Sequence, residues 1–205
     1  MKLEQQEQQA VEILDRSVRY QGYFQIVRYR FRHRLFAGGW TGGIVREVFE
    51  RGQAAGLLPY DPAADTVVLI EQFRIGALVA GLPAWQTEVV AGIIEDDENP
   101  EEVARREGVE EAGVTTIGEL IPICRYLVSP GGASESVALF CGRVDSRGIG
   151  GLHGLAAENE DIRVEVVPFP DAMRWLEEGQ IASAVAVIAL QWLALNRDRL
   201  RQSWR

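Results

Sequence analysis

The chain has 205 residues, a formal net charge of −9 at pH 7, and a composition in which nearly half of the residues are apolar. This balance is that of a soluble globular protein with one good-sized core. The excess of Asp and Glu over Lys and Arg excludes a general nucleic-acid binder, which needs positive charge against phosphates. No apolar stretch reaches the roughly 20 residues of a membrane-spanning helix, and the polar, acidic N-terminus is unlike a signal peptide.

The first fifty residues carry strand and turn signals. In residues 28–36, arginines alternate with aromatic and apolar side chains, and this period of two predicts a half-buried strand. The glycine-rich residues 36–43 predict a chain reversal, and residues 44–50 predict the next strand. With a further strand near residues 23–27, the segment predicts a small antiparallel sheet that would be marginal alone.

The rest of the chain mixes strands and helices. Strands are predicted over residues 54–60, 66–74, 85–90, 117–126, 135–144 and 162–167. Helices are predicted over residues 100–112, 171–178 and 181–202. Asn99 is a favourable N-cap for the first of these helices, Pro100 suits its first turn, and Gly113 ends it. This order predicts an α+β layered fold over residues 52–205, preceded by the antiparallel sheet of residues 1–51.

Two further features bear on function and location. Residues 145–160 contain four glycines without periodicity, as in functional loops. Cys124 and Cys141 lie in apolar, strand-like segments and are predicted to be buried free thiols, which favours a cytoplasmic location.

Three glutamates gather on the first predicted helix. Glu107, Glu110 and Glu111 have the i, i+3, i+4 spacing that places side chains on one helix face, where like charges repel. A hard divalent cation removes this repulsion, and Mg²⁺ binds both carboxylates and substrate phosphates. The alternative is an acidic helix face exposed to solvent.

The surrounding residues favour the cation site, because the segment Ala91–Val114 resembles the Nudix box, G-x5-E-x7-R-E-U-x-E-E-x-G-U, where U is apolar. The matching residues are Gly92, Glu98, Arg106, Glu107, Glu110, Glu111, Gly113 and Val114. Gly108 departs from the pattern, since an apolar side chain is usual there. Glycine inside a helix costs about 1 kcal/mol relative to alanine, but this departure changes no charged position.

The resemblance extends to the ADP-ribose pyrophosphatase branch of that family. It includes IEQFR (70–74), VSPGGASE (128–135), HGLAAENEDIRV (153–164), and YRFRHRLF and FERG in the N-terminal segment. Pro130 lies sixteen residues past the box, a spacing associated with ADP-ribose. The resemblance implies the Nudix fold, with mixed β-sheets sandwiched between α-helices, and a homodimer whose N-terminal sheets are exchanged. It also implies Mg²⁺ as cofactor, two or three ions, for which Mn²⁺ can substitute.

The resemblance also assigns roles to residues. Metal ligands are expected to be the carbonyl of Ala91 and the carboxylates of Glu107, Glu110, Glu111 and Glu160. Glu158 and Glu160 are candidates for the general base, in either order, with Glu111 the third residue of the catalytic set. Arg106 is expected to orient a glutamate, with Glu98 as partner, in what is alternatively a purely structural ion pair. Gly92 is expected to permit close backbone approach at the metal site.

Substrate contacts are expected from both predicted domains. The candidates are Arg46, Arg51, Arg74, Ser129, Pro130, Gly131, Glu135 and Phe24. Arginine suits phosphate and can stack on a base, although each of these arginines is alternatively an ordinary surface residue. An aromatic side chain such as Phe24 can stack on adenine, although aromatic residues in strands more often belong to a core.

The sequence thus predicts hydrolysis of ADP-ribose to AMP and ribose 5-phosphate by a metal-activated water. One alternative is hydrolysis of another nucleoside diphosphate sugar, such as ADP-glucose or GDP-mannose. A second is a Nudix domain that senses a nucleotide without cutting it, although such domains usually lose box glutamates that this chain keeps. No membrane or nucleic-acid partner is expected.

Overall fold

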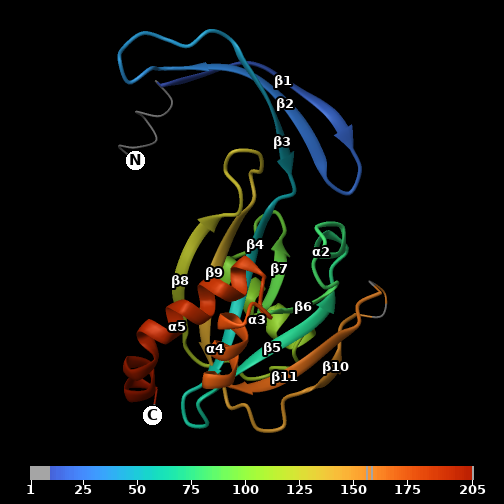
Figure 1. Cartoon of the computed structure of the whole chain (residues 1–205), viewed down its shortest axis with the longest axis vertical. Coiled ribbons are helices and arrows are strands. Elements are labelled where there is room, and N and C mark those ends of the chain that lie inside the picture. The colour runs from blue at the N-terminus through green and yellow to red at the C-terminus, as the bar shows by residue number, and fades with distance from the viewer. Residues whose placement is uncertain (1–9, 156, 158, 205) are drawn as a thin grey trace. The chain divides into compact units, whose positions relative to one another are not determined.

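The computed structural model of the chain describes residues 10–155, 157 and 159–204 (Figure 1). The chain divides into two compact units. The N-terminal unit comprises residues 1–52 and 127–136, and the main unit comprises residues 53–126 and 137–205. The segment 127–136 is therefore grouped with the N-terminal sheet, whereas the sequence placed it within the second domain.

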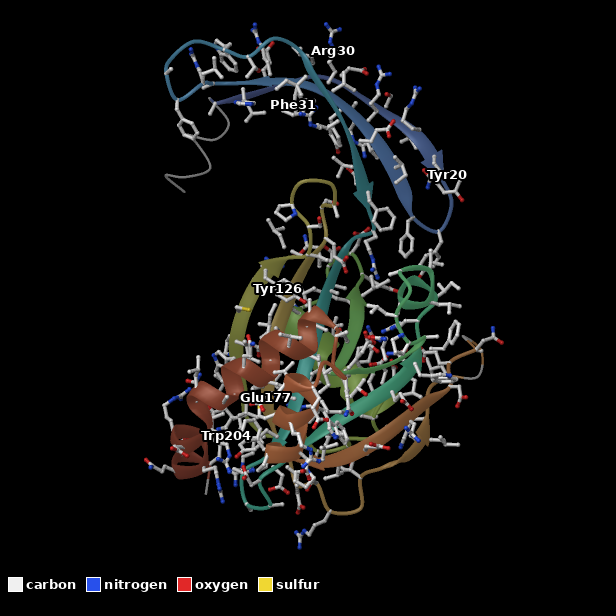
Figure 2. The ribbon with its side chains drawn as sticks, in the orientation of Figure 1. Tyr20, Arg30, Phe31, Tyr126, Glu177 and Trp204 are labelled. Carbon is white, nitrogen blue, oxygen red and sulfur yellow. The ribbon has the colours of Figure 1, made fainter. Side chains whose placement is uncertain are left out.

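The N-terminal unit is built on a three-stranded antiparallel sheet in the order β1-β2-β3. Its strands are β1 (Val11–Gln21), β2 (Gln25–His33) and β3 (Ile44–Glu50). The prediction of β3 is confirmed. The strands expected near residues 23–27 and over residues 28–36 form one strand, β2, which begins at Gln25 because residues 22–24 form the turn after β1, and which ends at His33. The sequence missed β1 because register shifts between Ile13 and Asp15 and between Val18 and Tyr20 interrupt its period of two. Arg30 and Phe31, adjacent in β2, point to opposite faces of the sheet (Figure 2).

The main unit is built on a mixed eight-stranded sheet. Its strands are β4 (Gln53–Asp61), β5 (Thr66–Phe73), β6 (Trp85–Glu88), β7 (Val90–Ile94), β8 (Leu120–Leu127), β9 (Ser136–Arg143), β10 (Gly151–His153) and β11 (Ile162–Pro168). The order is β10-β11-β5-β4-β9-β8, with β6 paired to β5 and β7 paired to β4. β4 and β9 run parallel. Two predictions fail locally: the single strand over 85–90 is divided at Val89, and the loop 145–160 contains the short strand β10.

In the described part of the chain, four helices accompany this sheet: α2 (Ile75–Val79), α3 (Pro100–Glu110), α4 (Phe169–Glu177) and α5 (Ala184–Ser203). The predicted start of α3 is confirmed, because Asn99 Oδ1 accepts a hydrogen bond from the Glu101 N–H at 2.9 Å. The short helix α2 was not predicted. No helix in the described ranges is long and apolar enough to cross a membrane.

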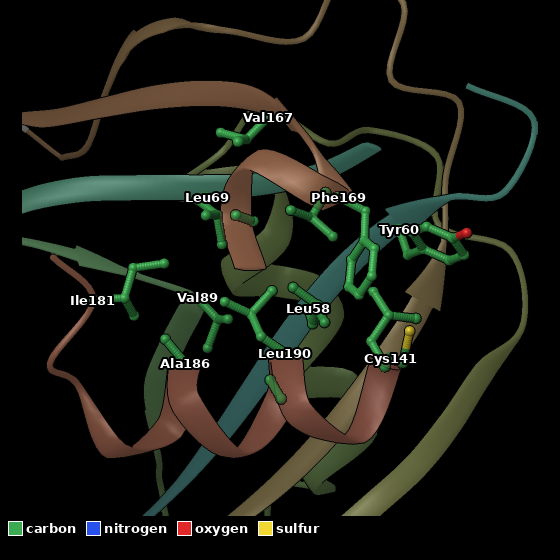
Figure 3. Close-up of a cluster of buried hydrophobic side chains, with 14 of the residues drawn as sticks. Leu58, Tyr60, Leu69, Val89, Cys141, Val167, Phe169, Ile181, Ala186 and Leu190 are labelled. Atoms are coloured by element: carbon green, nitrogen blue, oxygen red, sulfur yellow. The ribbon is translucent and has the colours of Figure 1, made fainter. Parts of the chain in front are cut away.

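Helices cover both faces of the sheet. In β5, Val67 and Leu69 face the apolar layer that contains Leu190 of α5 (Figure 3), whereas Val68 and Ile70 face a second layer under α3. Trp204, at the end of α5, closes the first layer and donates its indole N–H to Glu119 Oε2 at 2.9 Å (Figure 2). The predicted α+β sandwich is confirmed by this two-layer core.

The two cysteines differ in environment. Both are free thiols, as predicted. Cys141 is fully buried in β9, and burial raises the pKa of its thiol to about 12. Cys124 is exposed, which corrects the prediction that it is buried. Its strand, β8, is at the edge of the sheet, so alternate side chains of that strand face solvent.

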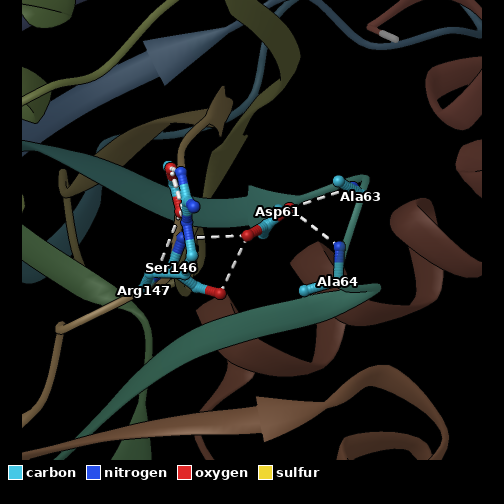
Figure 4. Close-up of polar contacts among 6 residues, drawn as sticks. Asp61, Ala63, Ala64, Ser146 and Arg147 are labelled. Carbon is cyan, nitrogen blue, oxygen red and sulfur yellow. Dashed lines mark hydrogen bonds and ion pairs between the residues drawn. The ribbon is translucent and has the colours of Figure 1, made fainter.

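A buried carboxylate fixes the β4–β5 turn to the start of the long loop. Asp61 Oδ1 accepts hydrogen bonds from the N–H groups of Ala63 and Ala64 at 2.9 and 3.0 Å (Figure 4). Its Oδ2 accepts from the N–H and hydroxyl of Ser146, both at 2.9 Å. Burial favours the neutral acid, yet these hydrogen bonds hold the pKa of Asp61 below its usual range. The start of the loop 145–160 is therefore held to the β4–β5 turn.

Substitution of Asp65 by Asn is expected to destabilise the fold by about 2 kcal/mol at pH 7, because its hydrogen bonds lose their charged acceptor. Asp65 accepts from Arg197 Nε at 2.7 Å and from the Tyr60 hydroxyl at 2.8 Å, and Arg197 holds its pKa below the usual range. A lowered acid pKa stabilises the fold above the ordinary value near pH 4 and ceases to do so as pH falls through the folded pKa. Urea denaturation from pH 7 downwards should show the difference between the proteins shrinking below about pH 4; a constant difference would contradict this account.

Candidate active site

The three clustered glutamates lie on one face of α3 and its C-terminal end, as predicted, and differ in burial. Glu111 is 4% exposed, and the side chains of Glu107 and Glu110 are 12% and 33% exposed. The Ala91 N–H in β7 donates to Glu111 Oε2 at 3.0 Å. The helix thus turns two nearly buried carboxylates toward the strand that contains Ala91 and Gly92.

Gly92 makes room for one of these carboxylates. A Cβ atom at this position would lie 1.9 Å from Glu107 Oε1 and 2.5 Å from Glu107 Cγ. Any side chain here would therefore displace Glu107. This agrees with the expectation that glycine is needed for a close approach at this point.

Burial without full compensation perturbs both carboxylates. Burial raises the pKa of Glu111 to about 8, opposed by the Ala91 hydrogen bond and reinforced by the charge of Glu107. Burial also raises the pKa of Glu107, with the charges of Glu110 and Glu160 adding to the effect and Arg106 opposing it. Two nearby acids that resist ionisation mark a site where a cation would be strongly favoured.

Arg106 is surrounded by glutamates. Its Nη1 lies 2.8 Å from Glu107 Oε1 and 3.0 Å from Glu110 Oε2, and its Nε lies 3.7 Å from Glu98 Oε1. Glu98 Oε2 also accepts the Glu95 N–H at 2.9 Å. These contacts agree with the expectation that Arg106 orients glutamates, with Glu98 among its partners.

Arg74, the expected phosphate-binding residue of this unit, directly follows β5. Its Nε and Nη2 both lie 2.8 Å from Glu88 Oε2, and its charge acts on Glu111. Glu88, on β6, also accepts a hydrogen bond from Gln72. Sequence reasoning missed Glu88. The register that pairs β5 with β6, which brings Glu88 to Ile70, was not visible in the chain order.

The long loop brings one of its two expected glutamates to the same site. Glu160 is close enough that its charge raises the pKa of Glu107 and of Glu111. Its Oε2 accepts the Leu155 N–H at 3.1 Å, and its own N–H donates to the Leu155 carbonyl at 3.3 Å. Glu158, the other candidate base, lies outside the described residues.

Three of the expected substrate residues of the N-terminal unit, Phe24, Arg51 and Glu135, form one cluster. Arg51 lies 5.1 Å from the ring centroid of Phe24, and its Nη1 lies 3.5 Å from Glu135 Oε2. Phe49 donates its N–H to the Gly132 carbonyl at 2.8 Å, which ties β3 to the segment of Ser129, Pro130 and Gly131.

Arg46 lies in β3 directly opposite Tyr29 of β2. Its side chain is exposed and donates to the Val45 carbonyl at 2.8 Å. Among the described residues, Arg46 forms no hydrogen bond or ion pair with Phe24, Arg51 or Glu135. All of these residues belong to the N-terminal unit, whereas Arg74 belongs to the main unit.

The carboxylate set fits a hard divalent cation, although it is not closed around one. Among residues 10–155, 157 and 159–204, no three acidic, histidine or cysteine side chains already converge tightly enough to hold a metal ion. Arg106 instead forms ion pairs with Glu107 and Glu110 and partly neutralises their charge. Glu107, which packs against Gly92, and the nearly buried Glu111 supply carboxylate oxygens of the kind that Mg²⁺ prefers.

Comparison with known proteins places this arrangement in context. A model of the NUDIX domain matches residues 50–188. An ADP-ribose pyrophosphatase of Escherichia coli (strain K12) is 51% identical over 194 residues, covering 95% of this chain and 92% of that protein. A GDP-mannose pyrophosphatase of Escherichia coli O157:H7 is 35% identical over 152 residues, covering 74% and 78%. A solved structure described as "Crystal structure of ADP compounds hydrolase" shares the fold, with a TM-score of 0.69, 18% identity, and coverage of 95% and 96%.

Proposed function

Since this chain belongs to the NUDIX family, we propose that it is a Mg²⁺-dependent pyrophosphohydrolase that converts ADP-ribose and water to AMP and ribose 5-phosphate. The observation that carries the proposal is the pair of nearly buried glutamates, Glu107 and Glu111, held against the backbone of Ala91 and Gly92. A surface acidic patch would not need this burial. The similarity to an ADP-ribose pyrophosphatase over 95% of the chain supports the choice of substrate.

Each group of the main unit has a proposed task. The carbonyl of Ala91 and the carboxylates of Glu107, Glu110, Glu111 and Glu160 would hold two or three Mg²⁺ ions, for which Mn²⁺ could substitute. When bound, these ions neutralise the diphosphate and lower the pKa of the attacking water. Arg74, fixed by Glu88, binds the diphosphate. Glu158 or Glu160 accepts the proton of the water as its oxygen attacks phosphorus and the P–O–P bond breaks.

The N-terminal unit is proposed to bind the nucleotide. The ring of Phe24 stacks on adenine, and Arg51 and Arg46 contact the nucleotide or its phosphates. Ser129, Pro130 and Gly131 shape the ribose end, and Glu135 reaches the substrate. The proposed cytoplasmic location is supported by the two free thiols.

A product assay tests the reaction. Incubation of the protein with ADP-ribose and Mg²⁺ should yield AMP and ribose 5-phosphate in equal amounts, measured by chromatography, and chelation should stop the reaction. The competing hypothesis of a GDP-mannose hydrolase is supported by the 35% identical relative. Competition among ADP-ribose, ADP-glucose and GDP-mannose separates the two. We expect the highest kcat/KM for ADP-ribose, and a higher value for another sugar nucleotide would overturn the substrate assignment.

We further propose a homodimer in which the N-terminal sheets are exchanged. The three-stranded sheet forms a unit of its own with one fully buried side chain, Val27, among its described residues. Ile13, Val18 and Tyr20 of β1 are 56%, 45% and 62% exposed, which leaves apolar surface for a partner. Light scattering should give about twice the 22.8 kDa chain mass.

Mixing two inactive variants tests the exchange itself. The Arg46→Ala variant lacks a proposed nucleotide contact from the N-terminal sheet. The Glu111→Gln variant lacks a proposed metal ligand of the main unit. If sheets are exchanged, the hybrid dimer contains one intact site. An equal mixture, unfolded and refolded together, should then recover about a quarter of wild-type activity, because half of the dimers are hybrids with one of two sites intact. No recovery would contradict the exchange.

A further inference from the structure

The ring of His153 packs against the end of the glutamate helix. His153 ends β10 and pairs with Ile162 of β11. Its ring is so close to Gly113 that a Cβ added there would lie 2.4 Å from His153 Cε1. Because a carbonyl oxygen only accepts, His153 Nε2 carries the proton and donates to the Gly150 carbonyl at 3.1 Å, which fixes the plane of the ring.

Gly113 has two reasons to be glycine. Its φ of +63° lies in the left-handed region, which other residues disfavour. Its N–H donates to the Val109 carbonyl at 3.0 Å, and the following Val114 N–H donates to the Gly108 carbonyl at 2.9 Å. Gly113 thus reverses the chain after the end of α3, two residues past Glu111, and a group that contacts Gly113 has a defined position relative to that glutamate.

Gly154, the residue after His153, begins the segment that leads to Glu160. A Cβ at Gly154 would lie 2.8 Å from Glu160 Cβ and 3.0 Å from its carbonyl oxygen. Leu155 exchanges two hydrogen bonds with Glu160, one of them to the carboxylate itself. Contacts with Gly154 and Leu155, the two residues that follow His153, therefore fix the position of Glu160.

From these contacts, we propose that His153 is a positioning residue for the hydrolysis. Its ring, held against Gly113, sets the location of Glu160 relative to Glu107 and Glu111, and His153 itself touches neither substrate nor metal. This inference rests on the proposed function for its kinetic consequences. The physical contact between the loop and the helix end stands independently of that function.

The test compares His153→Ala with a matched control in the same strand. Leu152→Ala removes a side chain that is 76% exposed and points away from His153, so it should behave as wild type. For His153→Ala, amide hydrogen exchange at Leu155 and Glu160 should accelerate on the order of tenfold or more, because the loop base loses its support. This measurement needs neither metal nor substrate.

Kinetics then show whether the support matters for the reaction. His153→Ala should lower kcat for ADP-ribose on the order of tenfold to a hundredfold, as small misplacements of catalytic groups do. KM should stay within about twofold, while the Mg²⁺ concentration for half-maximal activity should rise. Partial unfolding alone would reduce kcat through the active fraction without changing the Mg²⁺ requirement.

A double-mutant cycle tests the contact itself. Gly113→Ala introduces a methyl group against the ring, and the same change in the His153→Ala background no longer meets that ring. The strain of alanine at a φ of +63° is common to both backgrounds, so the second loss in kcat should be smaller than the first by the part that the ring contact causes. Unchanged exchange at Leu155 and Glu160 in His153→Ala would overturn the proposal. Accelerated exchange with an inactive wild-type protein would instead refute only the proposed function.

Discussion

Replacement of Glu111 by Gln should reduce kcat for ADP-ribose hydrolysis at least about a hundredfold, because an amide oxygen is a far weaker ligand for Mg²⁺ than a carboxylate in the transition state. Glu107→Gln should have an effect of similar size. Both carboxylates are nearly buried and lie on the same side of α3, next to Ala91 and Gly92. Steady-state kinetics at saturating Mg²⁺ measure the loss.

The thermal stability of the metal-free Glu111→Gln protein should not fall, although its activity does. Burial raises the pKa of Glu111 to about 8, so the fold favours the neutral acid at pH 7 in the absence of metal. A neutral amide can still accept the Ala91 N–H. The metal-free Glu111→Gln protein should therefore unfold at the same temperature as wild type or higher. Added Mg²⁺ should raise the melting temperature of wild type more than that of the variant, since only wild type binds it well.

Glu101→Gln is the matched control for these substitutions. Glu101 lies in the first turn of the same helix and is exposed. Its loss should leave kcat within about twofold, because it is remote from the buried pair along the helix. Turnover retained by both Glu107→Gln and Glu111→Gln would refute the assignment of this helix face to metal binding.

The elements that the sequence predicted best are those whose signals are local. The helix α3 begins at Asn99 and Pro100, because the capping interaction and the first-turn proline act within a few residues. The strands β4 and β5 alternate between two core layers and could be read from their apolar runs. By contrast, β1 contains two register shifts, which destroy the simple period of two.

What the sequence could not predict depends on pairing between distant segments. Glu88 holds Arg74 only because β6 pairs with β5, and Asp61 meets Ser146 across 85 positions of sequence. The grouping of residues 127–136 with the N-terminal sheet follows from the bridge between Phe49 and Ala133. Such contacts are set by tertiary packing and leave no periodic trace in the chain.

The roles of the glutamates were predicted by resemblance. The structure adds a physical reason why glycine occupies two nearby positions. Gly92 and Gly113 are each pressed by a side chain, Glu107 in one case and His153 in the other. Both glycines of the box therefore leave space for a neighbouring side chain. A glycine pattern in a sequence shows that space is needed but does not show which side chain fills it.

Gly92→Ala is expected to separate activity from folding most clearly. The new Cβ would lie 1.9 Å from Glu107 Oε1, far inside contact distance, so the carboxylate must move. The group in the way is the end of a flexible side chain, and the backbone of β7 need not shift. We therefore expect a loss in kcat on the order of tenfold to a hundredfold with a change in unfolding free energy of about 1 kcal/mol or less.

Two comparisons make this prediction specific to Glu107. Gly76→Ala, in α2, places a methyl group where no atom lies within 4 Å, and it should leave kcat unchanged. In the Glu107→Gln background, Gly92→Ala should cause little further loss, because the group it displaces has already been disabled. Additive losses in that double variant would mean that Gly92 acts through some other group, and the close approach of Glu107 to the strand would then not explain why glycine occupies this position.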